Sequence, residues 1–224
     1  MEKLGGLSLI EKEVLRIAED IIDKNKFISL QLLQNTAKTN LGYDKETISS
    51  AIFQLILKKV IFPGKKLTLL NVLVNEKRNN ILNFINDHPG THLREIRKCL
   101  ELNPKVTGWH LSVLENFELI YSKKYLKYLC YFPNDFKKEL EEPLLTLKNE
   151  SAILILKTIY NHPELDLEQI KYLLDLPQQV IEYILKKLVH SKIIQIYEED
   201  GAEYFNINEE IFYSIRKFVK IELE

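Results

Sequence analysis

Residues 88–120 read HPGTHLREIRKCLELNPKVTGWHLSVLENFELI, and a stretch of the same pattern begins at His162, 74 residues later. The apolar positions of the two stretches coincide. The first has Ile96, Leu100, Leu102, Val106, Leu111, Leu114 and Ile120 where the second has Ile170, Leu174, Leu176, Val180, Leu185, Leu188 and Ile194. Self-similarity at a fixed offset indicates one structural unit that is used more than once. The two stretches therefore predict two copies of one small domain.

The first of these copies has the pattern of three helices followed by a hairpin. Apolar residues recur at helical spacing over residues 75–87, Pro89-Gly90 ends that helix, and a second helix is expected over residues 92–100. Asn103-Pro104, an N-cap followed by proline at the first helical position, opens a third helix to Phe117. Residues 119–121 and 126–132 predict strands around Lys123-Lys124-Tyr125. This is the order of a winged helix, in which the third helix normally enters the major groove and the hairpin forms the wing.

The second copy predicts the same elements. Helices are expected over residues 150–161, 167–174 and from 175–177 to His190, and strands over residues 193–197 and 203–207. Asp200-Gly201 between these strands is a strong hairpin turn signal. A last amphipathic helix, residues 209–221, lies outside the repeat. Its apolar face must cover its own domain, a neighbouring domain or a partner chain.

The N-terminal part of the chain aligns with the first copy at an offset of 59 residues, which matches Ile52 with Leu111. Ser8 and Glu11 form a capping box, and helices are expected over residues 9–22, 29–38 and from Asp44 through residue 56. Residues 60–62 and 67–70 predict strands around Pro63-Gly64. The predicted fold class is therefore mainly α with small β-hairpin wings. It comprises three tandem winged-helix domains at residues 1–74, 75–140 and 141–224, the last of which includes the C-terminal helix.

The composition is that of an ordinary globular protein. Of the 224 residues, 46% are hydrophobic and 28% are charged, and no apolar run approaches the roughly 18–20 residues that span a bilayer. The N-terminus runs into an acidic helical pattern rather than an apolar signal segment, so we expect a cytoplasmic protein without membrane insertion. The only cysteines, Cys99 and Cys130, are expected to be reduced and buried, ahead of a disulfide or a metal site.

The net charge of −1 conceals a division along the chain. Residues 1–75 and 76–140 each carry 11 Lys and Arg against 8 Asp and Glu, whereas residues 141–224 carry 9 against 16. The net charges of +3, +3 and −7 mean that the first two thirds tolerate a polyanion and the last third repels one. The predicted wing of the third domain carries Glu198, Glu199, Asp200 and Glu203, so we expect that it does not contact DNA.

Sequence motifs of catalysis are absent. There is no phosphate-binding Gly-rich loop, no Gly-x-Ser-x-Gly elbow, no His-Glu-x-x-His and no Cys-x-x-Cys. The five histidines never stand with Cys or a second His at ligand spacing on one helix. We therefore expect no enzyme activity, no bound metal and no cofactor.

The stretch from His88-Pro89-Gly90 through Trp109-His110-Leu111 and Leu119-Ile120 to Tyr131-Phe132-Pro133 resembles the archaeal winged helix-turn-helix transcriptional regulators related to the ArsR and MarR families. Those proteins have Pro-Gly before the second helix, an aromatic-His-Leu sequence in the third, a Leu-Ile start to the wing and Tyr-Phe-Pro after it. The resemblance covers residues 76–135 and implies a DNA-binding winged helix.

The resemblance also implies which residues contact DNA. The outward face of the third helix would present Gly108, Trp109, Ser112, Glu115 and Asn116, with Lys105 at its entry. Lys123, Lys124 and Lys127 would form a basic wing that reaches phosphates, and Arg94 and Arg97 would add charge from the second helix. Lys45, Lys65 and Lys66 are the candidates in the first domain. The helix departs from the family at Gly108 and Trp109, where the family usually places Ser, Thr, Gln or Arg.

Two residues of the third helix also have structural interpretations. Trp109, the only tryptophan, either packs against an adjoining domain or the tail helix, or stacks on a nucleic acid. His110 is interpreted as a hydrogen-bonded structural residue rather than a switch.

Two classes of function remain. The first is a DNA-binding transcriptional regulator that contacts double-stranded DNA through its first two domains, while the acidic third domain and the C-terminal helix mediate dimerisation or partner binding. The alternative is a winged-helix protein-interaction scaffold without direct DNA contact, similar to subunits of the ESCRT-II membrane-remodelling complex or to polymerase-associated factors. The resemblance and the basic wing favour the regulator, whereas tandem copies without linkers suit the scaffold.

Overall fold

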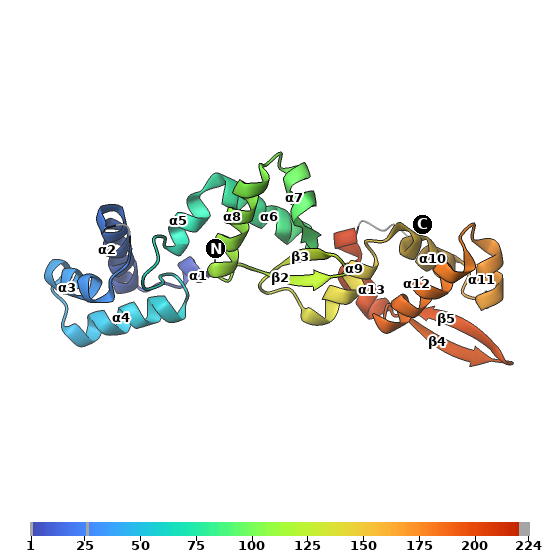
Figure 1. Ribbon diagram of the computed structural model, residues 1–224. Helices are drawn as coiled ribbons and strands as arrows, with labels where there is room; N and C mark the ends of the chain where they lie inside the picture. The colour runs from blue at the N-terminus through green and yellow to red at the C-terminus, as the bar shows by residue number, and fades with distance from the viewer. Residues whose placement is uncertain (1, 26, 220–224) are drawn as a thin grey trace. The chain divides into compact units, whose positions relative to one another are not determined.

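The computed structural model describes residues 2–25 and 27–219 (Figure 1). The described part is mainly helical and contains two small antiparallel sheets. The chain divides into two compact units, which we call unit 1 (Met1–Phe84 and Leu93–Tyr121) and unit 2 (Ile85–His92 and Ser122–Glu224). The boundary between the units crosses the second predicted domain, and the division into three domains stays a prediction.

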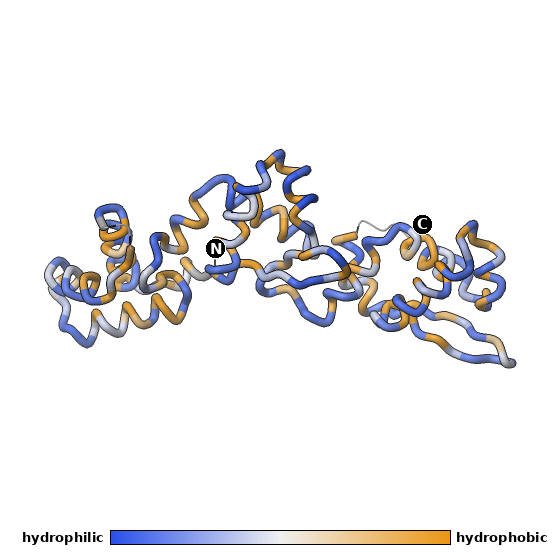
Figure 2. The backbone as a smooth tube through the Cα atoms, in the orientation of Figure 1, coloured by the Kyte–Doolittle hydropathy of each residue, from blue (hydrophilic) through white to orange (hydrophobic). Residues whose placement is uncertain are grey.

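Unit 1 begins with helices that the sequence largely predicts. They are α1 (Glu2–Gly5), which the sequence did not predict, α2 (Leu9–Asn25), α3 (Leu30–Leu41) and α4 (Lys45–Leu57). The expected N-caps are present, because Ser29 accepts the N–H of Leu32 and Asp44 accepts that of Thr47 at 2.8 Å. Hydrophobic and hydrophilic residues alternate along α2 and α4 (Figure 2), and the apolar ones form a core that includes Val14, Ala18, Ile21, Leu33, Ile48, Ile52 and Leu55.

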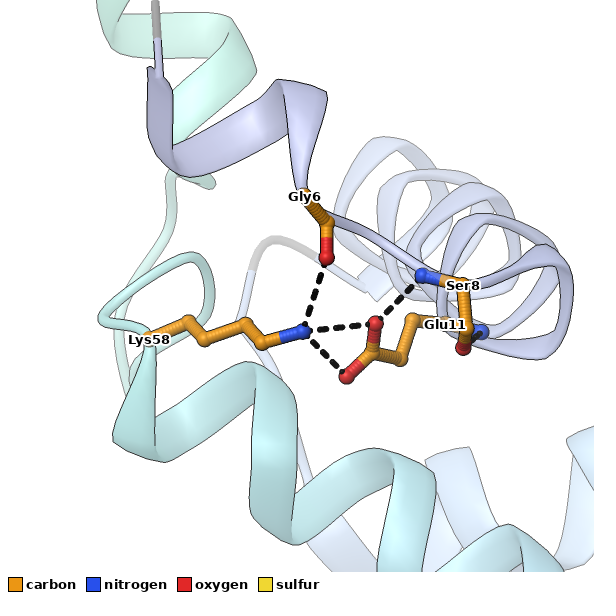
Figure 3. A network of polar contacts seen from close by, with 4 residues as sticks. All are labelled: Gly6, Ser8, Glu11 and Lys58. Carbon is orange, nitrogen blue, oxygen red and sulfur yellow. Dashed lines mark hydrogen bonds and ion pairs between the residues drawn. The ribbon is translucent and has the colours of Figure 1, made fainter.

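An ion pair between a half-buried lysine and a buried glutamate joins the start of α2 to the end of α4 (Figure 3). Lys58 donates to both carboxylate oxygens of Glu11 at 2.8 Å and to the carbonyl of Gly6 at 3.1 Å. The predicted capping box is formed, since the Ser8 N–H donates to Glu11 at 2.6 Å and the Ser8 hydroxyl accepts the Glu11 N–H. Burial raises the pKa of Glu11, but the hydrogen bonds from Lys58 and Ser8 outweigh it, so this pKa lies below its ordinary value.

Replacing Glu11 by Gln is expected to lower the free energy of unfolding by about 1–2 kcal/mol at pH 7, because the ammonium group of Lys58 loses its charged partner. The Glu11 pKa is lower in the folded state, so this stabilisation is present above the ordinary value of 4.5 and disappears as the pH falls below it. Urea unfolding at pH 7 and pH 4 measures both effects. Asp20→Asn, at an exposed acidic residue of the same helix, is the control, and equal losses in the two variants would contradict the prediction.

The predicted β-hairpin of the first domain is wrong. Residues 69–74 form a short helix, α5 (Leu69–Val74), and residues 60–67 form a loop whose backbone bonds to Ile28: the Ile28 N–H donates to Lys65 and the Ile28 carbonyl accepts the N–H of Gly64. Thr68 explains the error. Its hydroxyl accepts the Asn71 N–H while the Asn71 side chain accepts the Thr68 N–H, and this capping box starts a helix on an apolar run too short to be told from a strand.

Three further helices follow, and they lie wholly or mostly in unit 1. They are α6 (Glu76–Asp87), α7 (Leu93–Cys99) and α8 (Pro104–Asn116). Ile81, Ile96, Leu111 and Leu114 from these helices are fully buried, and α7 packs against α8. The second helix was predicted to begin at His92, but Thr91 and His92 form a short strand, β1 (Thr91–His92), in unit 2.

Unit 2 contains the second sheet and most of the first, whose strand β2 (Ile120–Tyr125) begins in unit 1. The first has the strand order β1-β3-β2 and includes β3 (Tyr128–Pro133), with Thr91 opposite Tyr131. The turn lies at Leu126-Lys127, two residues beyond the predicted one, because Leu126 takes the positive φ of 52° that reverses the chain. The second sheet pairs β4 (Ile194–Glu199) with β5 (Ala202–Ile207) around Asp200-Gly201, as predicted.

The helices of unit 2 follow the predicted order, with one addition. They are α10 (Glu150–Asn161), α11 (Leu167–Leu173), α12 (Gln178–His190) and α13 (Glu209–Val219), and the addition is the pair η1 (Lys138–Leu140) and α9 (Glu141–Thr146). The tail helix α13 contacts η1 and α9, with Phe212 and Ile215 buried, so its apolar face is covered inside its own unit. Residues 220 and 221 of the predicted tail helix lie outside the described residues.

Neither Cys99 nor Cys130 forms a disulfide in the described part of the chain, and only Cys130 is buried. The prediction that both are buried is wrong for Cys99, which ends α7 on the solvent side of the helix. None of the helices in the described part of the chain has the length and hydrophobicity needed to cross a bilayer.

Gly90 holds a tight turn between α6 and β1. Its φ is 71°, its N–H donates to the Tyr131 carbonyl at 2.8 Å, and a Cβ added to it would lie 3.0 Å from Leu145 and 3.3 Å from Phe132. Glycine is therefore required here both for the backbone conformation and for the close approach of the apolar side chains.

Replacing Gly90 by Ala is expected to lower the free energy of unfolding by about 2–3 kcal/mol, from the left-handed backbone and the crowded Cβ together. Gly201→Ala is the matched control in the same unit, because Gly201 has a φ of 79° and open space around its Cβ. It is expected to cost only about 1 kcal/mol in urea unfolding. Equal costs at the two positions would show that the packing at Gly90 relaxes freely.

Candidate nucleic-acid interface

The helix α8 buries one face and exposes the other. Asn103 caps it by accepting the Lys105 N–H at 3.0 Å, and Pro104 occupies its first position. Thr107, His110, Leu111, Val113 and Leu114 are buried. The exposed side carries Lys105, Val106, Trp109, Ser112 and Asn116, while Gly108 and Glu115 are partly exposed. The outward face thus combines one cation, uncharged polar residues and apolar residues, and presents no fully exposed carboxylate.

Trp109 lies on a buried arginine. Its side chain is 55% exposed, and the Arg78 guanidinium carbon stands 5.4 Å from the centre of its indole ring. Arg78, on the first turn of α6, is itself only 4% exposed and donates to the carbonyls of Asn71 at 2.9 Å and Val72 at 3.2 Å. The guanidinium therefore supports the indole from inside unit 1 while much of the ring remains open to solvent.

His110 is buried next to this cluster, and its Nδ1 atom does not make the hydrogen bond that the sequence interpretation expects of a structural histidine. It is 4% exposed, and its Nδ1 atom has no hydrogen-bond partner among the described residues. Burial lowers its pKa, and the positive charges of Arg78 and Lys77 lower it further. His110 is therefore held neutral at neutral pH by its surroundings.

The arginines of α7 differ in accessibility. Arg94 is exposed, whereas Arg97 is half-buried and its Nε atom is buried without a hydrogen-bond partner in the described part of the chain. Because α7 packs against α8, both arginines lie on a helix adjacent to α8. Arg94 is the more accessible of the two for a phosphate contact.

The candidate residues of the first domain do not belong to a wing. Lys45 is exposed at the first position of α4, and Lys65 and Lys66 are exposed in the loop that replaces the predicted hairpin. The outward side of α4 carries two large apolar residues, Phe53 at 57% exposure and Leu57 at 56%. The structure therefore places these three lysines on α4 and on a loop rather than on a hairpin wing.

The lysines of the β2–β3 hairpin differ in whether they already have an ion-pair partner. Lys123 is paired with Glu141 of α9 at 2.7 Å, and that carboxylate is buried. Lys124 and Lys127 are exposed, and the Lys127 ammonium group lies 5.4 Å from the ring centre of Tyr128. Lys123 therefore has a structural partner, and Lys124 and Lys127 are the accessible cations of the wing.

The structure collects the predicted residues of the second domain in two places. Arg94, Arg97, Lys105, Gly108, Trp109, Ser112 and Asn116 lie on the adjacent helices α7 and α8 of unit 1, and Lys123, Lys124 and Lys127 lie on the β2–β3 hairpin in unit 2. Sequence reasoning missed Arg78 and Glu141. Arg78 stands three residues before Ile81, on the apolar stripe of α6, and a charged residue at that position was a usable signal. Glu141 gave no comparable signal.

Comparison with known proteins gives one informative similarity. The chain is 37% identical over 182 residues to an uncharacterised HTH-type transcriptional regulator of Methanocaldococcus jannaschii. The match covers 79% of this chain but only 45% of the relative, so the chain spans less than half of the relative's length. No protein-family model matches the chain. The similarity is to part of a protein described as a helix-turn-helix transcriptional regulator.

The stability of the protein is expected to fall below about pH 6.5 partly through His110. Because its pKa is lowered in the folded state, the unfolded chain binds the proton more readily, so stability is full above the ordinary value of 6.5 and declines as the pH falls below it. The His110→Gln variant is expected to lose this part of the decline in urea unfolding between pH 7.5 and 5.5. His162→Gln, at an exposed histidine, is expected to retain it. An unchanged pH dependence in His110→Gln would contradict the assignment.

Proposed function

We propose that the chain is a DNA-binding transcriptional regulator in which α8 is the recognition helix and the β2–β3 hairpin is the wing. The observation that carries the proposal is the outward face of α8. Lys105, Trp109, Ser112 and Asn116 are exposed there, and no acidic residue of the helix is fully exposed. A helix of this kind can approach a groove without placing a carboxylate against phosphates.

The accessible cations support the same proposal. Lys124 and Lys127 on the wing, Arg94 on α7 and Lys105 on α8 are long, exposed side chains suited to phosphate contacts. Lys45, Lys65 and Lys66 of the first domain can add sequence-independent contacts of the same kind. The similarity to part of a protein described as an HTH-type transcriptional regulator agrees with this function.

We infer a different role for the third predicted domain. The β4–β5 hairpin exposes Glu198, Glu199 and Glu203, which would repel a phosphate backbone. Tyr172 at 94% exposure and Leu173 at 54% give α11 an apolar surface suited to a protein partner or a second copy of the chain. Because α13 already buries its apolar face inside unit 2, α11 is a better candidate for this contact than the tail helix. Sedimentation velocity of the protein and of Tyr172→Ala tests self-association.

The wing provides the direct test of DNA binding. The protein is expected to bind a generic duplex at low salt with an affinity that falls steeply as salt rises, as measured by fluorescence anisotropy of labelled DNA. The double variant Lys124→Ala/Lys127→Ala is expected to bind more weakly and to reduce the slope of log K against log salt by about 2, one for each phosphate contact removed.

Lys186→Ala is the matched control for this experiment, because Lys186 is an exposed lysine on α12 outside the proposed interface. It is expected to leave both affinity and slope unchanged. Lys123→Ala is a separate case, since it deprives the buried Glu141 of an ion pair and is expected to lower stability. Absence of duplex binding at low salt and micromolar protein would overturn the proposed function.

A further inference from the structure

The base-contacting chemistry of α8 is unusually apolar for a recognition helix. Its first two turns expose Lys105, Val106 and Trp109. The helix contains no Arg or Gln, and its one carboxylate, Glu115, lies in the last turn and is partly exposed. The N-terminal part of a recognition helix is the part that reaches base edges in the major groove. In that groove, the group that apolar side chains can recognise is the C5-methyl group of thymine.

The Trp109 side chain is also positioned in the free protein, without DNA. The buried Arg78 guanidinium lies 5.4 Å from its ring centre and is fixed by the carbonyls of Asn71 and Val72. An aromatic side chain supported on one side and 55% exposed loses little conformational entropy when the exposed part is covered. The ring is therefore a preorganised apolar contact rather than a mobile one.

The exposed cations on α6, α7 and α8 favour DNA over a protein as the partner of Trp109. Lys77 is exposed on α6 next to Arg78 in the sequence, and Arg94 and Lys105 are exposed on α7 and α8. Exposed cations on the helix that carries Trp109 and on the two helices before it are complementary to a polyanion. A hydrophobic protein patch would leave these cations without partners.

We propose that Trp109, positioned by Arg78 and assisted by Val106, contacts thymine methyl groups in the major groove, so that the protein prefers A·T base pairs under α8. The inference rests on the proposed function and names the base pairs that the same helix selects. Arg78 acts here as a positioning residue, because it touches Trp109 and not the DNA.

Replacing thymine by uracil tests this contact, because the substitution removes the methyl group and keeps every hydrogen-bonding group of the base. Three labelled duplexes of equal length are compared by anisotropy: one rich in A·T pairs, the same duplex with uracil in place of thymine, and one rich in G·C pairs. The protein is expected to bind the thymine duplex most tightly, and to lose about threefold to fourfold in affinity for each contacted methyl group that is removed.

Two variants connect the preference to the cluster. Trp109→Ala is expected to lose most of the difference in affinity between the thymine and uracil duplexes, with only the contribution of Val106 left, while its salt slope stays that of the unchanged protein. Arg78→Lys keeps the charge but loses the planar fork that bonds two carbonyls, so its thymine-to-uracil ratio is expected to shrink and the emission of Trp109, the only tryptophan, to shift toward that of a solvated indole. Phe53→Ala, at an exposed aromatic residue on α4, is the matched control and is expected to keep the ratio.

The outcomes separate this inference from the proposed function. Absence of salt-dependent binding to all three duplexes overturns the function and the inference with it. Salt-dependent binding with equal affinity for the thymine and uracil duplexes overturns the inference alone. If Trp109→Ala leaves DNA binding unchanged but abolishes self-association in sedimentation, Trp109 is a protein contact and the inference is again overturned. Trp109→Phe, which keeps an apolar ring, is expected to retain part of the thymine preference if the inference holds.

Discussion

A single buried guanidinium constrains the part of unit 1 from which the proposed function follows. Arg78 takes its charge into the interior at the start of α6, where an arginine without partners would cost several kcal/mol. Its guanidinium donates to two backbone carbonyls of α5 and lies against the indole of Trp109. The same group therefore holds together α5, the start of α6 and the exposed side of α8. The outward face of α8 depends on this arrangement.

The two hairpins have the same position after a third helix but opposite surfaces. Three helices followed by a hairpin occur in α6–β3, where the short strand β1 lies between the first two helices, and again in α10–β5. The first hairpin exposes Lys124 and Lys127, and the second exposes Glu198 and Glu199. The fold tolerates this difference because the wing residues lie outside the core, so charge changes there without cost to packing. Identical core patterns are therefore compatible with different partners.

The elements that sequence reasoning predicted well are those with local signals. Asn103-Pro104 before α8 and Asp44 before α4 act on backbone N–H groups two or three residues away, so their effect is visible in the sequence alone. The errors occurred where local signals were weak or ambiguous. The run 69–74 suits a strand or a helix equally, and the capping box of Thr68 with Asn71 decided for a helix. The strand β1 exists only because Thr91 and His92 find partners in β3, about forty residues later.

The sequence by itself determined the order of the three helices and the hairpin in each of the last two predicted domains, and which residues of α8 face outward. These features follow from periodicity and caps, which depend on neighbours along the chain. Only the tertiary structure decided which charged groups are available. It paired Lys123 with Glu141, placed Arg78 beneath Trp109, left the Nδ1 atom of His110 without a partner and exposed Cys99. For the first three, the physical reason is that burial and ion pairing depend on residues of other elements, which the sequence pattern does not place. For Cys99, the short helix α7 offers too few turns to define its buried side.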